Sequence, residues 1–281
     1  MVSKSSQIVI TGIGATTPLG NSFDAIGDAL QAGRSGIDWC DIGTFSRQQE
    51  HVVAQVQSVN LTMENAVVSP SWRIDKSSRL EQFAIVPAAH ALADAGIQPS
   101  SCTFEQKNRI GFIAGIGAEQ LKDWERDFLD GGHDVFHAKR QPSLVHRAAQ
   151  ILDIHGPAAT VAAACASSGY AIALGKTWLE TGLIDACVVG GCDVLSPTAL
   201  AAFHNLRALS RRDDNPEKAS RPFDQDRDGF VMGEGGVFFV LERSDSALSR
   251  QSKIHGVLAG VGMSSDATLL VTPCSDPVQA S

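Results

Sequence analysis

Hydrophobic and polar positions along the chain alternate between short apolar runs and longer amphipathic stretches. QIVITGIG at 7–14 and RIGFIAGIG at 109–117 are runs typical of buried strands. NSFDAIGDALQAG starts with helix-capping residues and ends at Gly33, and RLEQFAIVPAAHALADAG at 79–96 has helical spacing. Pro87 is expected to kink this second helix or to mark its start. The order of elements predicts an α/β fold built on a largely buried sheet.

The same pattern continues to the last third of the chain. PSLVHRAAQILDIHG at 142–156 predicts a helix, and PAATVAAAC then runs extended. The apolar positions from Ala166 to Gly182 follow helical spacing, so Cys165 falls where a strand turns into a helix. IDACVVGGCDVL, GGVFFVLE and IHGVLAGVGMSSDA predict further strands, and a short helix follows the second of them. The last strand is followed by the polar stretch TLLVTPCSDPVQAS, which offers no helix to cover it.

Composition narrows the class of protein. The chain has 281 residues, of which 43% are hydrophobic, enough for one large or two ordinary globular domains. The net charge of -8 makes nucleic acid an unexpected ligand, because such a ligand requires a basic surface. No window has the apolar length of a membrane span, and the first apolar run is too short for a signal peptide. Six scattered cysteines indicate a reducing compartment, so we expect a cytoplasmic protein.

Three familiar motifs are incomplete in this chain. GIGATT at 12–17 and GIGAEQ at 115–120 lack the third glycine of a dinucleotide-binding loop, and we interpret both as turns where backbones pass closely. DQDRDGFVMGE at 224–234 has the acidic spacing of a calcium loop, but Gly235 stands where the loop needs glutamate. The eight histidines form no HExxH motif. We therefore expect neither a metal nor a cofactor.

Cys165 admits two interpretations. VAAACASSGYAIALG at 161–175 surrounds it with small residues, and a free cysteine often serves as a small buried hydrophobe. At a strand-to-helix junction, however, the helix dipole and free N–H groups lower the pKa of a thiol and can hold an oxyanion. A packing role and a nucleophilic role both fit these residues. Cys187, Cys192 and Cys274 lack this setting, and we interpret them as structural.

Several segments occur together in an order that is typical of one family. VITGIGATTPLG is followed by VAAACASSGYAIALG, by VVGGCDVLSPTALAAFHNLRALSRRDDNPEKASRPFDQDRDGFVMGEGGVFFVLE and by GVGMSSDA. From about residue 7 to residue 273 the chain resembles β-ketoacyl-[acyl-carrier-protein] synthases of the elongating type. The resemblance implies a thiolase-like fold, in which two similar α/β halves stack as α-β-α-β-α layers. Residues 1–252 would form the N-terminal half with the nucleophile, and residues 253–281 the first strand of a C-terminal half that is largely absent.

The resemblance also implies an activity. Cys165 matches the position that takes an acyl group, as a thioester, from acyl carrier protein. A malonyl thioester then loses carbon dioxide, and its carbanion attacks the acyl group in a decarboxylative Claisen condensation. Fatty-acid and polyketide synthesis both use this reaction, which needs no metal or redox cofactor. The implied partners are acyl carrier protein and a second ketosynthase-type chain, in a homodimer or a heterodimer.

Three other residues match functional positions of the family. Phe203 matches an aromatic residue that lines the acyl pocket, and core packing is the alternative for it. Arg79 and Arg207 match basic positions that touch the carrier protein, and a solvated arginine is the alternative for each. Such a local basic patch would allow an acidic enzyme to bind an acidic partner.

The chain departs from the family in two places. HAKRQPS puts Lys139 and Arg140 where the family commonly has apolar residues that close the partner subunit's acyl pocket, so we expect a shorter or more polar acyl group. The family's two catalytic histidines, its lysine and a glycine-rich oxyanion loop belong to the second half. We therefore expect the chain to be truncated or completed by another polypeptide.

Two other functions remain as alternatives. One is a non-catalytic partner subunit of the chain-length-factor type, a class that typically lacks the cysteine. The other is a thioester hydrolase or acyltransferase that uses Cys165 alone, which leaves the RDGF segment unexplained.

Overall fold

A computed structural model describes residues 6–42, 50–61, 67–117, 119, 121–132, 142–212 and 214–265 of the chain. The strands are β1 (Ile8–Thr16), β2 (Asp38–Asp41), β3 (Glu50–Val53), β4 (Ile110–Gly115), β5 (Ala158–Val161), β6 (Ala186–Asp193), β7 (Gly235–Arg243) and β8 (Gly256–Val257). The α-helices are α1 (Phe23–Gln31), α2 (Arg79–Asp94), α3 (Phe104–Lys107), α4 (Leu121–Leu129), α5 (Leu144–Ile151), α6 (Ser167–Glu180), α7 (Pro197–Asn205) and α8 (Ser244–Ser249). Short 3-10 helices cover Ile74–Lys76, Pro99–Ser101 and Pro216–Lys218.

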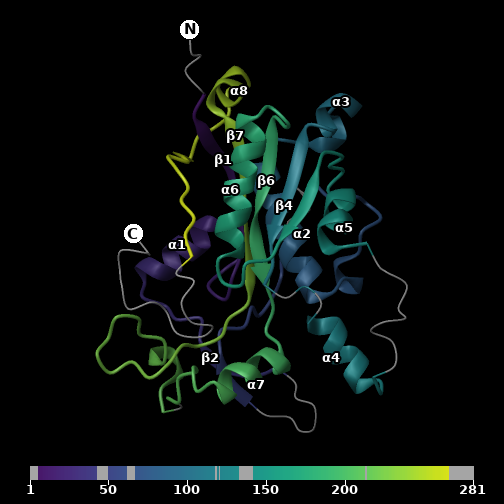
Figure 1. Ribbon diagram of the computed structural model, residues 1–281. Coiled ribbons are helices and arrows are strands. Elements are labelled where there is room, and N and C mark those ends of the chain that lie inside the picture. The colour runs from purple at the N-terminus through teal and green to yellow at the C-terminus, as the bar shows by residue number, and fades with distance from the viewer. Residues whose placement is uncertain are drawn as a thin grey trace.

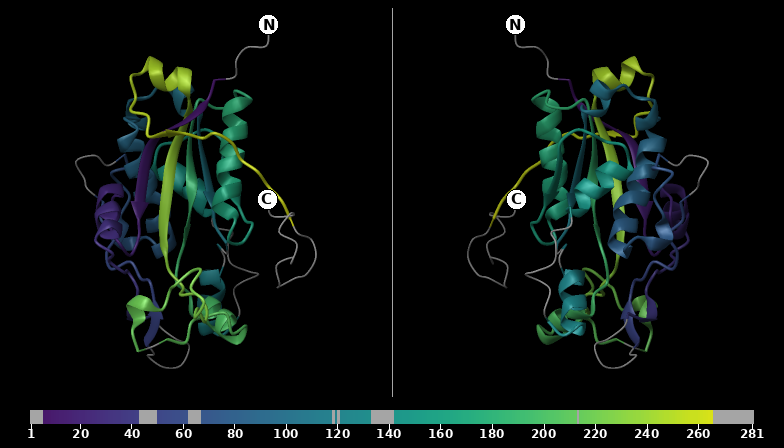
Figure 2. Two further views of the ribbon diagram at one scale, coloured as in Figure 1. Left: turned by 90° about the vertical axis from the view of Figure 1, so that its left-hand side faces the viewer. Right: turned by 90° about the vertical axis from the view of Figure 1, so that its right-hand side faces the viewer.

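A six-stranded sheet with the strand order β5-β4-β6-β7-β1-β8 forms the centre of the fold, between helices on both faces. Helices α2 and α5 cover one face and α6 covers the other (Figures 1 and 2). The larger hydrophobic core lies between the sheet, α2 and α5, and contains Phe83, Phe112 and Phe238. A smaller core lies under α6 and contains Ile113, Leu179 and Val189. The predicted α/β layering is therefore confirmed.

The sheet is mixed. β4 pairs in parallel with β5 and β6, whereas β7 is antiparallel to both β6 and β1. β6 leads directly into α7, which lies with α4 and the β2–β3 hairpin beyond one end of the sheet (Figures 1 and 2). This arrangement brings the C-terminal ends of β4 and β6 next to the N-terminal end of β7.

The glycines of GIGATT serve helix packing and do not form a turn. They lie inside β1, so the turn prediction is wrong, but the predicted close passage of backbones is confirmed. A Cβ at Gly12 would stand 2.0 Å from the oxygen of Ala91, and one at Gly14 would stand 1.9 Å from the oxygen of Pro87. α2 therefore rests directly on this strand. Pro87 lies inside α2, and the helix starts eight residues earlier at Arg79, so this proline does not mark the start.

The segment IHGVLAGVGMSSDA forms much less strand than its sequence predicts. Within its described part, residues 254–265, only Gly256 and Val257 are in a strand, and they pair with Ile10 and Val9 at the edge of the six-stranded sheet. The assignment of residues 253–281 to a second half stays a prediction. Of the helices in the described ranges, none combines the length and apolar character needed to cross a membrane.

Candidate active site

Cys165 occupies a tight turn between β5 and α6. Ala164 has a φ of +48°, in the left-handed region that non-glycine residues rarely adopt, and this turns the chain sharply. The hydroxyl of Ser167 donates to the oxygen of Ala164 at 2.6 Å and accepts from the N–H of Ala163 at 2.9 Å, which closes the turn. Cys165 is exposed at the tip. The predicted strand-to-helix junction is thus confirmed.

The first turn of α6 offers free amide groups next to this turn. The N–H of Ser167 donates to Ala164 and that of Tyr170 to Ala166, at 3.2 and 3.1 Å. The N–H groups of Ser168 and Gly169 have no acceptor within the described part of the chain. Free N–H groups and the helix dipole make such an end electropositive, which favours a thiolate and an oxyanion.

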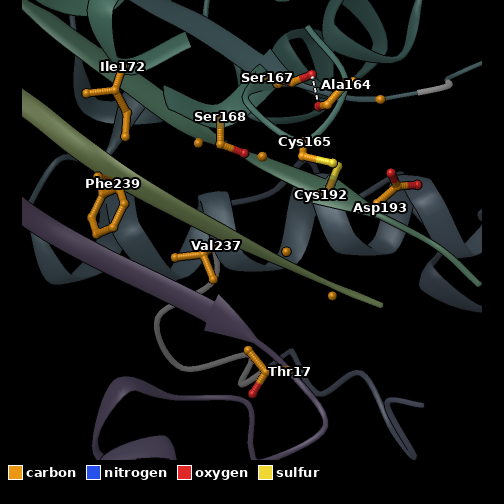
Figure 3. A pocket seen from close by; sticks show the side chains of 16 residues that line it. Thr17, Ala164, Cys165, Ser167, Ser168, Ile172, Cys192, Asp193, Val237 and Phe239 are labelled. Carbon is orange, nitrogen blue, oxygen red and sulfur yellow. Dashed lines mark hydrogen bonds between the residues drawn. The ribbon is translucent and has the colours of Figure 1, made fainter. Parts of the chain in front are cut away.

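An open pocket with a volume of about 390 Å³ surrounds Cys165. Figure 3 shows Cys165 and Asp193 toward one end, and Ile172 and Phe239 toward the other. The walls come from the first turns of α6, the C-terminal ends of β4 and β6, and the N-terminal part of β7. The thiol therefore faces a space with a polar end and an apolar end.

Two glycines allow α6 to rest closely on the sheet at this point. A Cβ at Gly115 would stand 2.4 Å from backbone atoms of Ser167 and Ser168, and one at Gly191 would stand 2.0 Å from the Oγ of Ser168. The close backbone approach predicted for GIGAEQ is confirmed at Gly115, the last residue of β4. These contacts fix the height of the Cys165 turn above the strands.

The other cysteines have different surroundings. Cys187 and Cys192 are buried in the two cores, and burial raises the pKa of both thiols far above the usual range. Their predicted structural role is confirmed, although Cys192 also borders the pocket. Desolvation raises the pKa of the neighbouring Asp193 carboxyl. Cys274 lies outside the described residues.

Phe203 lies on α7, away from the residues that line the Cys165 pocket. Its ring meets that of Phe230 edge to face, with centroids 5.1 Å apart. The buried carboxylate of Glu125 holds the start of the same helix, because its Oε1 accepts from the N–H of Thr198 at 2.9 Å. The structure thus shows the packing role of Phe203, and its place in an acyl pocket stays a prediction.

The two arginines predicted to touch a carrier protein have different environments. The Nε of Arg79 donates to both carboxylate oxygens of Glu234, at 2.9 and 3.0 Å. Its guanidinium also donates to the oxygen of Val56 and lies 5.1 Å from the ring centroid of Phe83. Arg207 is exposed directly after α7, and its side chain has no ion-pair partner among the described residues. The guanidinium of Arg207 is therefore accessible from outside, whereas that of Arg79 is already paired with Glu234.

The acidic run DQDRDG organises its own loop. Asp228 accepts from the hydroxyl of Ser210 and the N–H of Arg211, both at 2.8 Å, and the bond from Arg211 is the main cause that lowers the pKa of this carboxyl. Asp224 accepts from the N–H of Asp226 at 2.8 Å. Over the described ranges, no group of three or more histidine, cysteine or acidic side chains is arranged to hold a metal ion.

Known proteins resemble this chain along most of its length. Residues 5–247 match the family described as "Beta-ketoacyl synthase, N-terminal domain". 3-Oxoacyl-[acyl-carrier-protein] synthase 2 of Synechocystis sp. is 32% identical over 282 aligned residues, which cover 97% of this chain and 66% of that protein. A putative polyketide beta-ketoacyl synthase 1 of Streptomyces halstedii is 32% identical over 272 aligned residues, which cover 91% of this chain and 63% of that protein.

Solved structures agree with this family. The ishigamide ketosynthase/chain length factor superposes with a TM-score of 0.76 at 27% identity, over 94% of this chain and 64% of the other. The fold is thus that of the thiolase-like ketosynthases. The chain spans about two thirds of the length of the proteins that it matches.

Proposed function

Because the chain belongs to the β-ketoacyl synthase family, we propose that it carries the nucleophile of a β-ketoacyl-[acyl-carrier-protein] synthase. The observation that carries the proposal is the exposed thiol of Cys165 in an open pocket beside the free amides of α6. The thiolate attacks the carbonyl of an acyl thioester, the carrier's thiol leaves, and the acyl group stays on Cys165. Free N–H groups at the helix start suit the oxyanion that forms during this exchange.

For the whole protein we propose the condensation step as well. A malonyl thioester on the carrier loses carbon dioxide, and its α-carbon attacks the acyl carbonyl. The Cys165 sulfur leaves, and a β-ketoacyl chain two carbons longer remains on the carrier. The names of the relatives support this reaction, in fatty-acid or polyketide synthesis. The division into residues 1–252 and 253–281 belongs to the same proposal, and a free thiol nucleophile suits a cytoplasmic location.

An acyl-transfer experiment tests the nucleophile. The purified chain is incubated with an acylated carrier protein, and the adduct is located by peptide mass spectrometry. We expect one acyl group on Cys165, none in C165S, and an unchanged adduct in C102S, since Cys102 is a half-buried cysteine outside the pocket. Folded wild-type protein without an adduct would favour a non-catalytic partner subunit. Rapid release of free acid from Cys165 would favour a hydrolase.

Arg207 is the proposed contact for the acidic carrier. R207E is expected to raise the KM for the acylated carrier several-fold and to weaken its dependence on salt, because a rim charge acts mainly on association. R34E is the matched control, since Arg34 is also exposed but follows α1. Equal effects of both variants, or an equal effect of R207E on a small acyl thioester, would contradict the contact.

We propose that the acyl group is shorter or more polar than a long fatty chain. This rests on Lys139 and Arg140, which lie outside the described residues. Competition between acyl carriers of different chain length tests it, and equal loading of long saturated chains would remove the proposal. The second ketosynthase-type chain is a further part of the proposal, supported by the ketosynthase/chain length factor among the similar structures.

A further inference from the structure

The buried carboxylate of Glu234 lies beside the C-terminal end of β6 and the N-terminal end of β7, two strand ends that border the Cys165 pocket. Glu234 directly precedes β7, and its side chain is 1% exposed. Its Oε1 accepts from the N–H of Val56 at 3.1 Å, and its Oε2 accepts from the N–H of Leu195 at 3.3 Å. Together with the ion pair to Arg79 at the start of α2, these bonds connect Glu234 to three other segments of the chain.

These bonds hold both strand ends that border the pocket. Residues 190–193 of β6 line the pocket, and the chain reaches Leu195 two residues later. On the other strand, the lining residues 235–237 follow Glu234 directly. Because Asp193 pairs with Gly235 in the last pair of the β6–β7 ladder, Glu234 fastens that ladder at its open end.

We propose that Glu234 is a positioning residue for the Cys165 pocket, with Arg79 as its charged partner. It acts through the backbone at the end of β6 and the start of β7. Without the negative charge, the guanidinium of Arg79 loses its counter-ion and the amides of Val56 and Leu195 lose a strong acceptor. The backbone of residues 190–193 and 235–237, here called the pocket floor, then becomes more mobile, although Cys165 itself is unchanged. The expected effect on acyl transfer rests on the proposed function, whereas the expected effect on the mobility of the floor does not.

Glu242, which lies on β7 itself, provides a matched control. Its side chain is 3% exposed and its Oε2 accepts from the Nε of Arg250 at 2.8 Å, so it is also a buried glutamate paired with arginine. It lies at the other end of β7, where it pairs with Val9 and Ala186, and it is absent from the pocket lining. E234Q and E242Q therefore remove similar ion pairs at opposite ends of one strand.

The first measurement is amide hydrogen exchange followed by mass spectrometry. We expect faster exchange in peptides covering 190–196 and 233–237 for E234Q, and wild-type exchange in both peptides for E242Q. Equal protection in E234Q and wild type, or equal loosening in both variants, would overturn the inference. This outcome does not depend on any acyl transfer, so it decides the matter even if the wild-type chain takes no acyl group and the proposed function fails.

The second measurement is the single-turnover rate of acyl transfer at saturating acyl carrier, per folded molecule. E234Q is expected to lower it on the order of 10- to 100-fold, since a displacement of about 1 Å costs rates of this size. Alkylation of Cys165 by iodoacetamide should stay close to wild type, and E242Q should match wild type in both rates. The double variant R79M/E234Q removes both charges and should regain stability without regaining the acyl-transfer rate. A rate that returns with stability would show a purely structural role.

Discussion

Replacement of Gly115 by alanine tests how closely α6 rests on the sheet beside Cys165. The added Cβ would stand 2.4 Å from the carbonyl carbon of Ser167 and from the nitrogen of Ser168. Carbon atoms normally approach to about 3.5 Å, so either α6 or β4 must move by roughly 1 Å. The clash is with backbone atoms, and a rotamer change cannot relieve it. Gly115 does not have a positive φ, so conformational strain adds nothing to the effect.

Two magnitudes follow from this displacement. Overpacking of a well-packed interior typically costs about 1–3 kcal/mol, so G115A should lower the free energy of unfolding by that amount. The displaced group is the first turn of α6, which holds the nucleophile, and a misplacement of about 1 Å costs on the order of 100-fold in rate. We expect the rate of Cys165 acylation to fall further than stability alone requires.

Urea unfolding and single-turnover acylation at a temperature where all variants are folded measure the two effects. G27A is the control, because an added Cβ at Gly27 in α1 has no neighbour within 4 Å and should raise stability by about 0.5–1 kcal/mol. If G115A unfolds and reacts like wild type, the close contact is wrong. If it loses stability but keeps its acylation rate, the link between this contact and the nucleophile is refuted.

Two further predictions concern titratable groups. Because burial raises the pKa of Cys187 and Cys192, iodoacetamide at pH 8 should label Cys165 well before either of them, and peptide mapping over time will show the order. The hydrogen bond from Arg109 lowers the pKa of the Asp185 carboxyl below its ordinary 3.8, so this carboxylate stabilises the fold above about pH 4 and loses its effect as pH falls through the lowered value. D185N should therefore melt lower at pH 7 and show a shallower loss of stability under acid, and equal pH profiles for both proteins would contradict this.

The elements with a strong local pattern were predictable from the sequence. α2 combines an N-terminal serine cap with a long apolar face, and β4 and β6 are apolar runs bounded by polar residues. The β2–β3 hairpin gives no such signal, because each strand has four residues and β2 reads DWCD. For β8 the apolar pattern predicts more strand than forms, since only two of its residues find partners on β1.

The position of Cys165 was predictable, but the construction of its pocket was not. The extended run before Cys165 and the helical spacing of apolar positions after it placed the cysteine at a strand-to-helix junction, which is a local property. The pocket also needs β7, and its floor is held by a contact between Arg79 and Glu234, 155 residues apart. No periodicity or local spacing contains such a contact. Family resemblance suggested a different role for Arg79 because it reports a position and not the partner of a side chain.

The segment RPFDQDRDGFVMGEGG at 221–236 is one of those that resemble the family, and in this chain its residues make structural contacts. Asp228 fixes the loop after α7, Glu234 fastens the ends of β6 and β7, and Gly229 lets backbones pass, since its Cβ would stand 2.3 Å from the carbonyl carbon of Leu209. None of these contacts involves the thiol of Cys165, so a chain of the same fold without the nucleophile could make all of them. The segment therefore predicts the scaffold equally well for a condensing enzyme and for a partner subunit. What separates them is the thiol at Cys165, so its acylation is the experiment that decides between the two.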